Sequence, residues 1–143
     1  NLKKYIFENN HFLGICVGMQ VLFEKGHEDN TTGGLNIFKG TVKKINITGF
    51  KTPIIGWNSI SVNQKFTDLP SLNIFENSMK EKFYFLHSYF CDAEISNIVA
   101  YSQISNFKYP AIIKKNNIYG VQFHPEKSRE QGLELIKNFS ELT

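Results

Sequence analysis

A cysteine between two glycines lies where the sequence changes from one hydrophobic pattern to another, and this change constrains the fold most. The segment GICVG (14–18) follows the short apolar run 11–15 and precedes residues 17–25, whose apolar side chains recur with helical spacing. The two glycines allow the backbone to turn sharply around the cysteine. The segment therefore predicts a strand, a tight turn that projects a thiol, and a helix.

The remaining pattern predicts short strands between two terminal helices. We expect a helix over residues 2–9 and strands over residues 41–47, 58–63, 83–90 and 97–102. Residues 110–123 predict a hairpin that turns at Asn116-Asn117, since asparagine tolerates positive φ. Helices mixed with short apolar strands indicate a layered α/β fold, in a single domain that covers residues 1–143.

The last helix is expected to begin at Ser128. Ser128 and Gln131 have the spacing of a capping box, in which each side chain bonds the backbone N–H of the other residue. Leu133, Ile136 and Phe139 recur with helical spacing and predict the face that packs on the sheet.

Composition narrows the class of protein. The 143 residues are 41% hydrophobic, enough for a core that needs no metal or disulfide to stabilise it. The formal charge of +3 is spread along the chain, unlike the basic clusters of nucleic-acid-binding proteins. Two cysteines without a Cys-x-x-Cys pair favour a reducing compartment, and no signal peptide or long apolar run is present. We therefore expect a cytoplasmic protein without membrane segments.

Cys16 is the candidate nucleophile. The N-terminus of the helix that follows it would favour the thiolate form, and the Val17 N–H would point to a developing oxyanion. The alternative is a buried structural cysteine, because free cysteines are among the most buried residues. Cys91 has no such turn around it and is interpreted as a bystander.

A cysteine nucleophile needs a base, and His124 is the best candidate among four histidines. It ends an apolar strand, and Glu126 follows two residues later, on the same side of an extended chain. That carboxylate could fix the tautomer of the imidazole. His87, after another apolar strand, is the rival base without a carboxylate nearby in sequence, and His27 with Glu28 is interpreted as surface.

Four ordered segments carry a resemblance to a known family: FLGICVGMQVLFE (12–24), GWN (56–58), FYFLHSY (83–89) and YGVQFHPEKS (119–128). They resemble class I glutamine amidotransferases and, more narrowly, the glutaminase subunit of imidazole glycerol phosphate synthase from histidine biosynthesis. The resemblance covers nearly the whole chain. It implies a layered α/β fold with a mostly parallel central sheet.

The resemblance also implies the substrate and the site. The Cys16 thiolate would attack the side-chain amide of glutamine, and His124, oriented by Glu126, would protonate the departing ammonia. Further residues would bind the amino-acid end of glutamine, namely Gln20, Glu28 and the backbone of Ser88 and Tyr89. No metal or cofactor is implied.

A partner is implied as well, because ammonia released into water at neutral pH is protonated and loses its nucleophilicity. In this family the partner is a (β/α)₈ cyclase subunit that receives the ammonia and forms imidazole glycerol phosphate and AICAR. The two subunits form a heterodimer, and Trp57 and Lys127 would lie on its interface.

Two departures from the family pattern leave more than one function open. The family begins with strands and a Pro-Gly-Val-Gly loop, the second oxyanion donor, which residues 1–143 do not contain, so we expect this chain alone to fold poorly and to hydrolyse little glutamine. Ile54-Ile55 stands where relatives often carry His-Met. The motifs also fit a subunit that serves the amidation of surface sugars. They fit less specifically a stand-alone cysteine hydrolase, such as a γ-glutamyl hydrolase, or a non-catalytic module that kept the fold.

Overall fold

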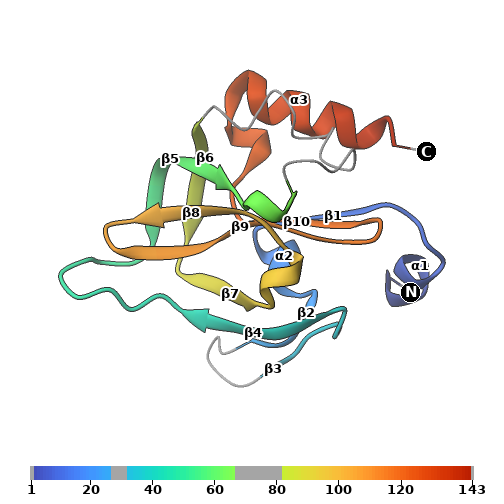
Figure 1. Cartoon of the computed structure of the whole chain (residues 1–143), viewed down its shortest axis with the longest axis horizontal. Helices are drawn as coiled ribbons and strands as arrows, with labels where there is room; N and C mark the ends of the chain where they lie inside the picture. Colours follow the sequence, from blue (N-terminus) through green and yellow to red (C-terminus); the bar gives the residue numbers. More distant parts are fainter. Residues whose placement is uncertain (1, 27–31, 67–81, 143) are drawn as a thin grey trace.

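The computed structural model describes residues 2–26, 32–66 and 82–142, and its strands form two sheets (Figure 1). The larger sheet has the strand order β1-β10-β9-β8-β5-β6, and the smaller one has the order β3-β2-β4-β7. The elements are α1 (Leu2–Phe7), β1 (Phe12–Ile15), α2 (Val17–Gln20), β2 (Phe23–Gly26), β3 (Thr32–Gly33), β4 (Phe38–Lys44), β5 (Ile54–Val62), η1 (Gln64–Phe66), β6 (Lys82–His87), β7 (Tyr89–Ala93), η4 (Ile95–Asn97), β8 (Ile98–Ile104), β9 (Phe107–Lys115), β10 (Ile118–Val121), η5 (Pro125–Lys127) and α3 (Arg129–Ser140).

The larger sheet is mixed, and the prediction of a mostly parallel sheet is wrong for the described residues. Only β1 and β10 pair in parallel within it; its other neighbours are antiparallel. The reason lies in the connections, because a parallel pair needs a long crossover whereas a two-residue turn joins only antiparallel strands. Such turns join β8 to β9 and β9 to β10, with positive φ at Ser105 and Asn116. The hairpin predicted around Asn116-Asn117 is confirmed.

The predicted helix over 17–25 is also wrong beyond its first turn. The helix α2 ends at Gln20, and Phe23 already belongs to β2, which pairs in parallel with β4. Leu22 and Phe23 are fully buried, and the Phe23 ring stacks on Phe38 with centroids 5.7 Å apart. Packing of these apolar side chains between the sheets therefore overrides the helical spacing.

The predicted strand over 83–90 is two strands that join the two sheets. Strand β6 pairs with β5 in the larger sheet, and β7 pairs with β4 in the smaller sheet. The strand conformation is interrupted between them at Ser88. This crossing places the end of β6 near the turn after β1.

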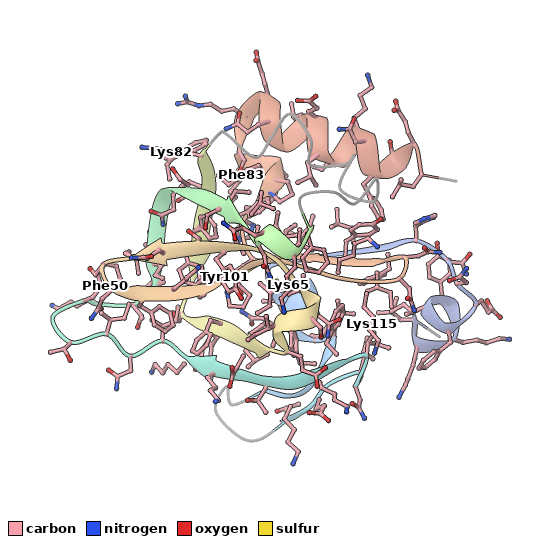
Figure 2. The ribbon with its side chains drawn as sticks, in the orientation of Figure 1. Phe50, Lys65, Lys82, Phe83, Tyr101 and Lys115 are labelled. Carbon is pink, nitrogen blue, oxygen red and sulfur yellow. The ribbon has the colours of Figure 1, made fainter. Side chains whose placement is uncertain are left out.

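The helix α3 is packed differently from the prediction. Ser128 precedes it but makes no side-chain cap, and Gln131 donates instead to the Lys82 carbonyl at 2.7 Å. Lys82 lies at the start of β6, next to the first turn of α3 (Figure 2). Leu133 is 61% exposed, whereas Leu135 is fully buried, so the predicted capping box and Leu133 as a core residue are both wrong. The helix is therefore rotated so that Leu135, and not Leu133, faces the core.

Two hydrophobic clusters hold the layers together. One joins the larger sheet to α3 through residues such as Phe83, Phe123 and Leu135. The other lies between β1, β10 and the smaller sheet, where α2 also packs (Figure 1), and includes Met19 and Phe38. Burial of each such side chain contributes about 1.5–3 kcal/mol. Among the described helices, none combines the length and apolar character needed to cross a membrane.

Candidate active site

Cys16 occupies the sharp corner between β1 and α2. Its backbone has φ 52° and ψ −108°, a conformation that residues other than glycine rarely adopt. The Cys16 N–H donates to the Val121 carbonyl at 2.8 Å and continues the β1–β10 pairing into the corner. A Cβ atom on Gly14 would lie 2.4 Å from the Gly18 carbonyl oxygen, so Gly14 allows the strand and the helix to approach. The predicted turn is therefore present.

The sulfur of Cys16 is buried and contacts two polar groups. It donates to the Leu86 carbonyl over 3.8 Å and accepts from the Gln122 amide over 3.7 Å. Gln122 is fully buried, and we did not single it out from the sequence. The signal that could have found it is an amide side chain within the apolar run 118–123.

Val17 follows Cys16 and begins the helix α2. Within the described parts of the chain, its N–H donates to no backbone carbonyl of the corner. The helix α2 spans only Val17–Gln20, so the dipole expected to favour a thiolate is limited to a single turn.

His124 lies on a turn that two hydrogen bonds fasten to β6 and a third bond closes on itself. Its N–H donates to the Tyr84 carbonyl at 2.8 Å, the Tyr84 N–H donates to the Ser128 hydroxyl at 2.9 Å, and that hydroxyl donates to the His124 carbonyl at 2.6 Å. The His124 Nδ1 lies 2.7 Å from Glu126 Oε1. The predicted His124–Glu126 contact is therefore present, although Glu126 reaches the ring from the turn η5 and not from an extended strand.

The nucleophile and the imidazole lie at the same edge of the larger sheet. Cys16 directly follows β1, His124 closely follows the parallel strand β10, and Ile15 pairs with Val121 at the end of both. Strand β6 contacts the Cys16 sulfur through the Leu86 carbonyl and the backbone N–H of His124 through the Tyr84 carbonyl. Carbonyls two residues apart on a strand lie on the same side, separated by about 7 Å. The structure thus places the Cys16 sulfur and the backbone of His124 at neighbouring positions along one strand.

His87, the rival base, lies at the end of β6. Its side chain is buried, and its Nδ1 lies 2.7 Å from the Tyr89 carbonyl. The pKa of His87 is lowered to about 4: burial lowers it most, the bond to the Tyr89 carbonyl raises it, and the nearby His124 lowers it by less. His87 is therefore neutral at neutral pH, with Nδ1–H as the donor. Its Nε2 has no hydrogen-bond partner within the described residues.

A cavity of about 310 Å³ opens beside the corner. Its lining includes Val17, Gln20, Gly33 and Val42. The Gln20 amide donates to the Tyr89 carbonyl and to Gln122 Oε1, each at 3.3 Å. Gln20 is thus placed next to the nucleophile as predicted for a substrate-binding residue.

Of the other predicted substrate residues, Ser88 and Tyr89 lie among the described residues and Glu28 does not. The Tyr89 carbonyl already accepts from His87 and Gln20, and the Ser88 carbonyl accepts from the Ile45 N–H at 2.9 Å. Glu28 and its neighbour His27 lie outside the described residues. In the parts of the chain that are described, no group of three or more His, Cys, Asp or Glu is arranged to hold a metal ion.

The predicted interface residues surround the outer side of the His124 turn. Ile55 and Trp57 lie on the same face of β5 and are 62% and 37% exposed. The Arg129 guanidinium lies 4.9 Å from the centre of the Trp57 ring, a cation–π contact. Lys127 is exposed on η5, next to Glu126.

Comparison with known proteins agrees with this geometry. The family model described as "Glutamine amidotransferase class-I" matches residues 1–142. The chain belongs to this family. It is 41% identical to "Imidazole glycerol phosphate synthase subunit HisH" of Caldanaerobacter subterraneus subsp. tengcongensis, over 99% of the chain and 66% of that relative. It is 43% identical to the protein of the same name from Lactococcus lactis subsp. lactis, over 90% of the chain and 61% of that relative.

Solved structures of class-I amidotransferases share the fold. A protein of Thermoplasma acidophilum described as one subunit of a GMP synthase has a TM-score of 0.62 and 26% identity, over 96% of the chain and 60% of that structure. A glutamine amidotransferase from Thermotoga maritima has a TM-score of 0.57 at 16% identity, over 98% of the chain and 51% of that structure. The predicted layered α/β class is confirmed. The chain spans about two thirds of the length of the curated relatives it matches.

Proposed function

We propose that this chain carries the glutaminase chemistry of an imidazole glycerol phosphate synthase. The observation that carries the proposal is that Cys16 and His124 contact the same strand, β6. The Cys16 sulfur bonds the Leu86 carbonyl and the His124 backbone bonds the Tyr84 carbonyl, two residues away on that strand. The names of the relatives at about 40% identity support the same assignment.

The Cys16 thiolate attacks the side-chain carbonyl carbon of glutamine, and a C–S bond forms as the carbonyl electrons move to oxygen. The Val17 N–H stabilises this oxyanion. His124 gives its proton to the nitrogen as the C–N bond breaks, so ammonia leaves and a thioester remains. His124 then takes a proton from water, the hydroxide cleaves the thioester, and glutamate leaves.

Glu126 supports His124 in both half-reactions. Its carboxylate accepts from Nδ1–H over 2.7 Å, which fixes the tautomer and stabilises the imidazolium before ammonia leaves and again after water is deprotonated. We place the substrate in the cavity beside the corner, with Gln20, Glu28 and the backbone of Ser88 and Tyr89 at its amino-acid end.

The proposed partner is a (β/α)₈ cyclase subunit in a heterodimer, and its docking surface is the face that carries Ile55, Trp57 and Lys127. Exposed apolar side chains beside a cation are common at the centres of protein interfaces. This face lies against the His124 turn, so a partner docked there would receive ammonia before it is protonated. Since free cysteines are typical of proteins in a reducing compartment, we place the reaction in the cytoplasm.

Labelling with 6-diazo-5-oxo-L-norleucine, an electrophilic glutamine analogue, tests the nucleophile. Cys16 should be labelled, Cys16→Ala should abolish labelling, and the matched variant Cys91→Ala should retain it. Labelling of Cys91 instead, or of neither, would refute the glutaminase assignment.

The partner and the acceptor need a second measurement. Glutamine hydrolysis should rise strongly only when both a histidine-pathway cyclase and its acceptor substrate are present. Hydrolysis that does not respond to the cyclase would indicate a stand-alone cysteine hydrolase. A response only to a sugar-amidating synthase would indicate the related subunit that serves surface sugars.

A further inference from the structure

We infer that Gln122 is a positioning residue that holds the Cys16 sulfur in the thiolate form. The inference rests on the proposed function, because it assigns a role around the same nucleophile. It starts from a polar side chain that is fully buried and contacts the sulfur directly, over 3.7 Å from Nε2.

A chain of hydrogen bonds fixes which way the Gln122 amide points. The Tyr89 carbonyl can only accept, so the Gln20 group that faces it must be the NH₂ group. The same NH₂ group donates to Gln122 over 3.3 Å and therefore requires an oxygen there. The opposite end of the Gln122 amide, its NH₂ group, then faces the sulfur.

The second contact of the Cys16 sulfur, with the Leu86 carbonyl, favours the protonated thiol over the thiolate. The thiol donates to the Leu86 carbonyl over 3.8 Å, and this bond is lost when the proton leaves. The contact with the Gln122 NH₂ group strengthens at that moment, because hydrogen bonds to a charged acceptor are about twice as strong as neutral ones. Gln122 therefore favours the nucleophilic form of Cys16, and the Leu86 carbonyl favours its resting form.

The same chain of bonds connects the substrate cavity with the nucleophile. Gln20 lines the cavity and also fixes the Gln122 amide. A ligand that engages Gln20 would therefore act on the contact between Gln122 and the sulfur.

Alkylation of Cys16 by iodoacetamide, followed over pH in the intact chain, tests the inference without any glutamine. Gln122→Met keeps the size of the side chain and removes the donor. Its alkylation rate at pH 7 should fall about tenfold, the value of one hydrogen bond to a charged sulfur, and the midpoint of its pH profile should move upward. In glutamine hydrolysis, kcat should fall by a similar factor while KM changes less than about twofold.

Gln103→Met is the matched control, since the Gln103 amide donates to the Ser105 carbonyl, away from the corner. It should alkylate at the rate of the unmodified protein. Gln122→Glu is a second variant, with the same shape but an acceptor in place of the donor, and its rate should fall at least as far as that of Gln122→Met.

Gln20→Met should lower the alkylation rate by a smaller factor than Gln122→Met does. The double variant Gln20→Met/Gln122→Met should alkylate no more slowly than Gln122→Met alone. Unchanged alkylation in folded Gln122→Met or Gln122→Glu protein would overturn the inference and leave the glutaminase assignment standing. Absence of labelling at Cys16 in the unmodified protein would instead overturn the proposed function. Circular dichroism of each variant identifies any that fail to fold, and the folded ones decide the test.

Discussion

Two histidines at neighbouring corners of the molecule make the same local contact and have different chemistry. In each, Nδ1 lies 2.7 Å from an oxygen two residues later in the chain, Glu126 Oε1 for His124 and the Tyr89 carbonyl for His87. The His124 side chain is 18% exposed, whereas His87 is buried among aromatic rings. A carboxylate can stabilise an imidazolium, and a carbonyl in an apolar pocket cannot offset the cost of burying the charge. The charge of the acceptor and the burial of the ring, and not the residue type, therefore decide which histidine can exchange protons.

Replacement of each histidine by asparagine is the strongest test of this difference. The asparagine NH₂ group can replace Nδ1–H in both places, so only the second ring nitrogen is lost. His124→Asn should reduce glutamine turnover by about 10²–10⁴-fold, the contribution of a general acid–base group. His87→Asn should stay within about tenfold of the unmodified protein at pH 8. Equal losses in the two variants, measured as kcat/KM with the partner present, would contradict the comparison.

The pH dependence of stability is expected to come from His87. Its pKa is about 4 in the folded protein and 6.5 in the unfolded chain, so the unfolded chain binds the proton first as the pH falls. The free energy of unfolding should therefore begin to fall below about pH 6.5 and lose about 3 kcal/mol by pH 4. Urea unfolding at several pH values measures this loss. His87→Asn should have a correspondingly flatter profile, and an unchanged profile would show that His87 is not buried neutral.

Glu126→Gln is expected to reduce glutamine turnover much less than His124→Asn does. The amide oxygen can still accept from Nδ1–H, and the Glu126 side chain is 46% exposed, where solvent screens its charge. We expect kcat to fall about tenfold while labelling of Cys16 by the glutamine analogue persists. A loss as large as that of His124→Asn would mean that the carboxylate does more than orient and stabilise the ring.

Local sequence predicted the catalytic corner well because its determinants are local. Glycine beside Cys16 and the two-residue spacing of His124 and Glu126 act within a few residues, and the contacts they predicted are present. The hairpin at Asn116-Asn117 was predictable for the same reason.

Features that depend on distant partners were not predictable from local sequence. Phe23 is part of a strand because Phe38 packs against it, and α3 turns Leu135, not Leu133, into the core beside the larger sheet. Gln122 escaped the sequence analysis because its partners, Cys16 and Gln20, are about a hundred residues away in the chain. No short-range pattern marks such a contact.

The backbone of Cys16 has a consequence for any attempt to make this protein more robust. A side chain held in a mirror-image region of φ and ψ costs of the order of 1–3 kcal/mol, and glycine would relieve it. An unguided selection for thermal tolerance would thus favour loss of the sulfur that we propose as the nucleophile. Durability and reactivity compete here at one residue, and engineering should begin elsewhere in the chain.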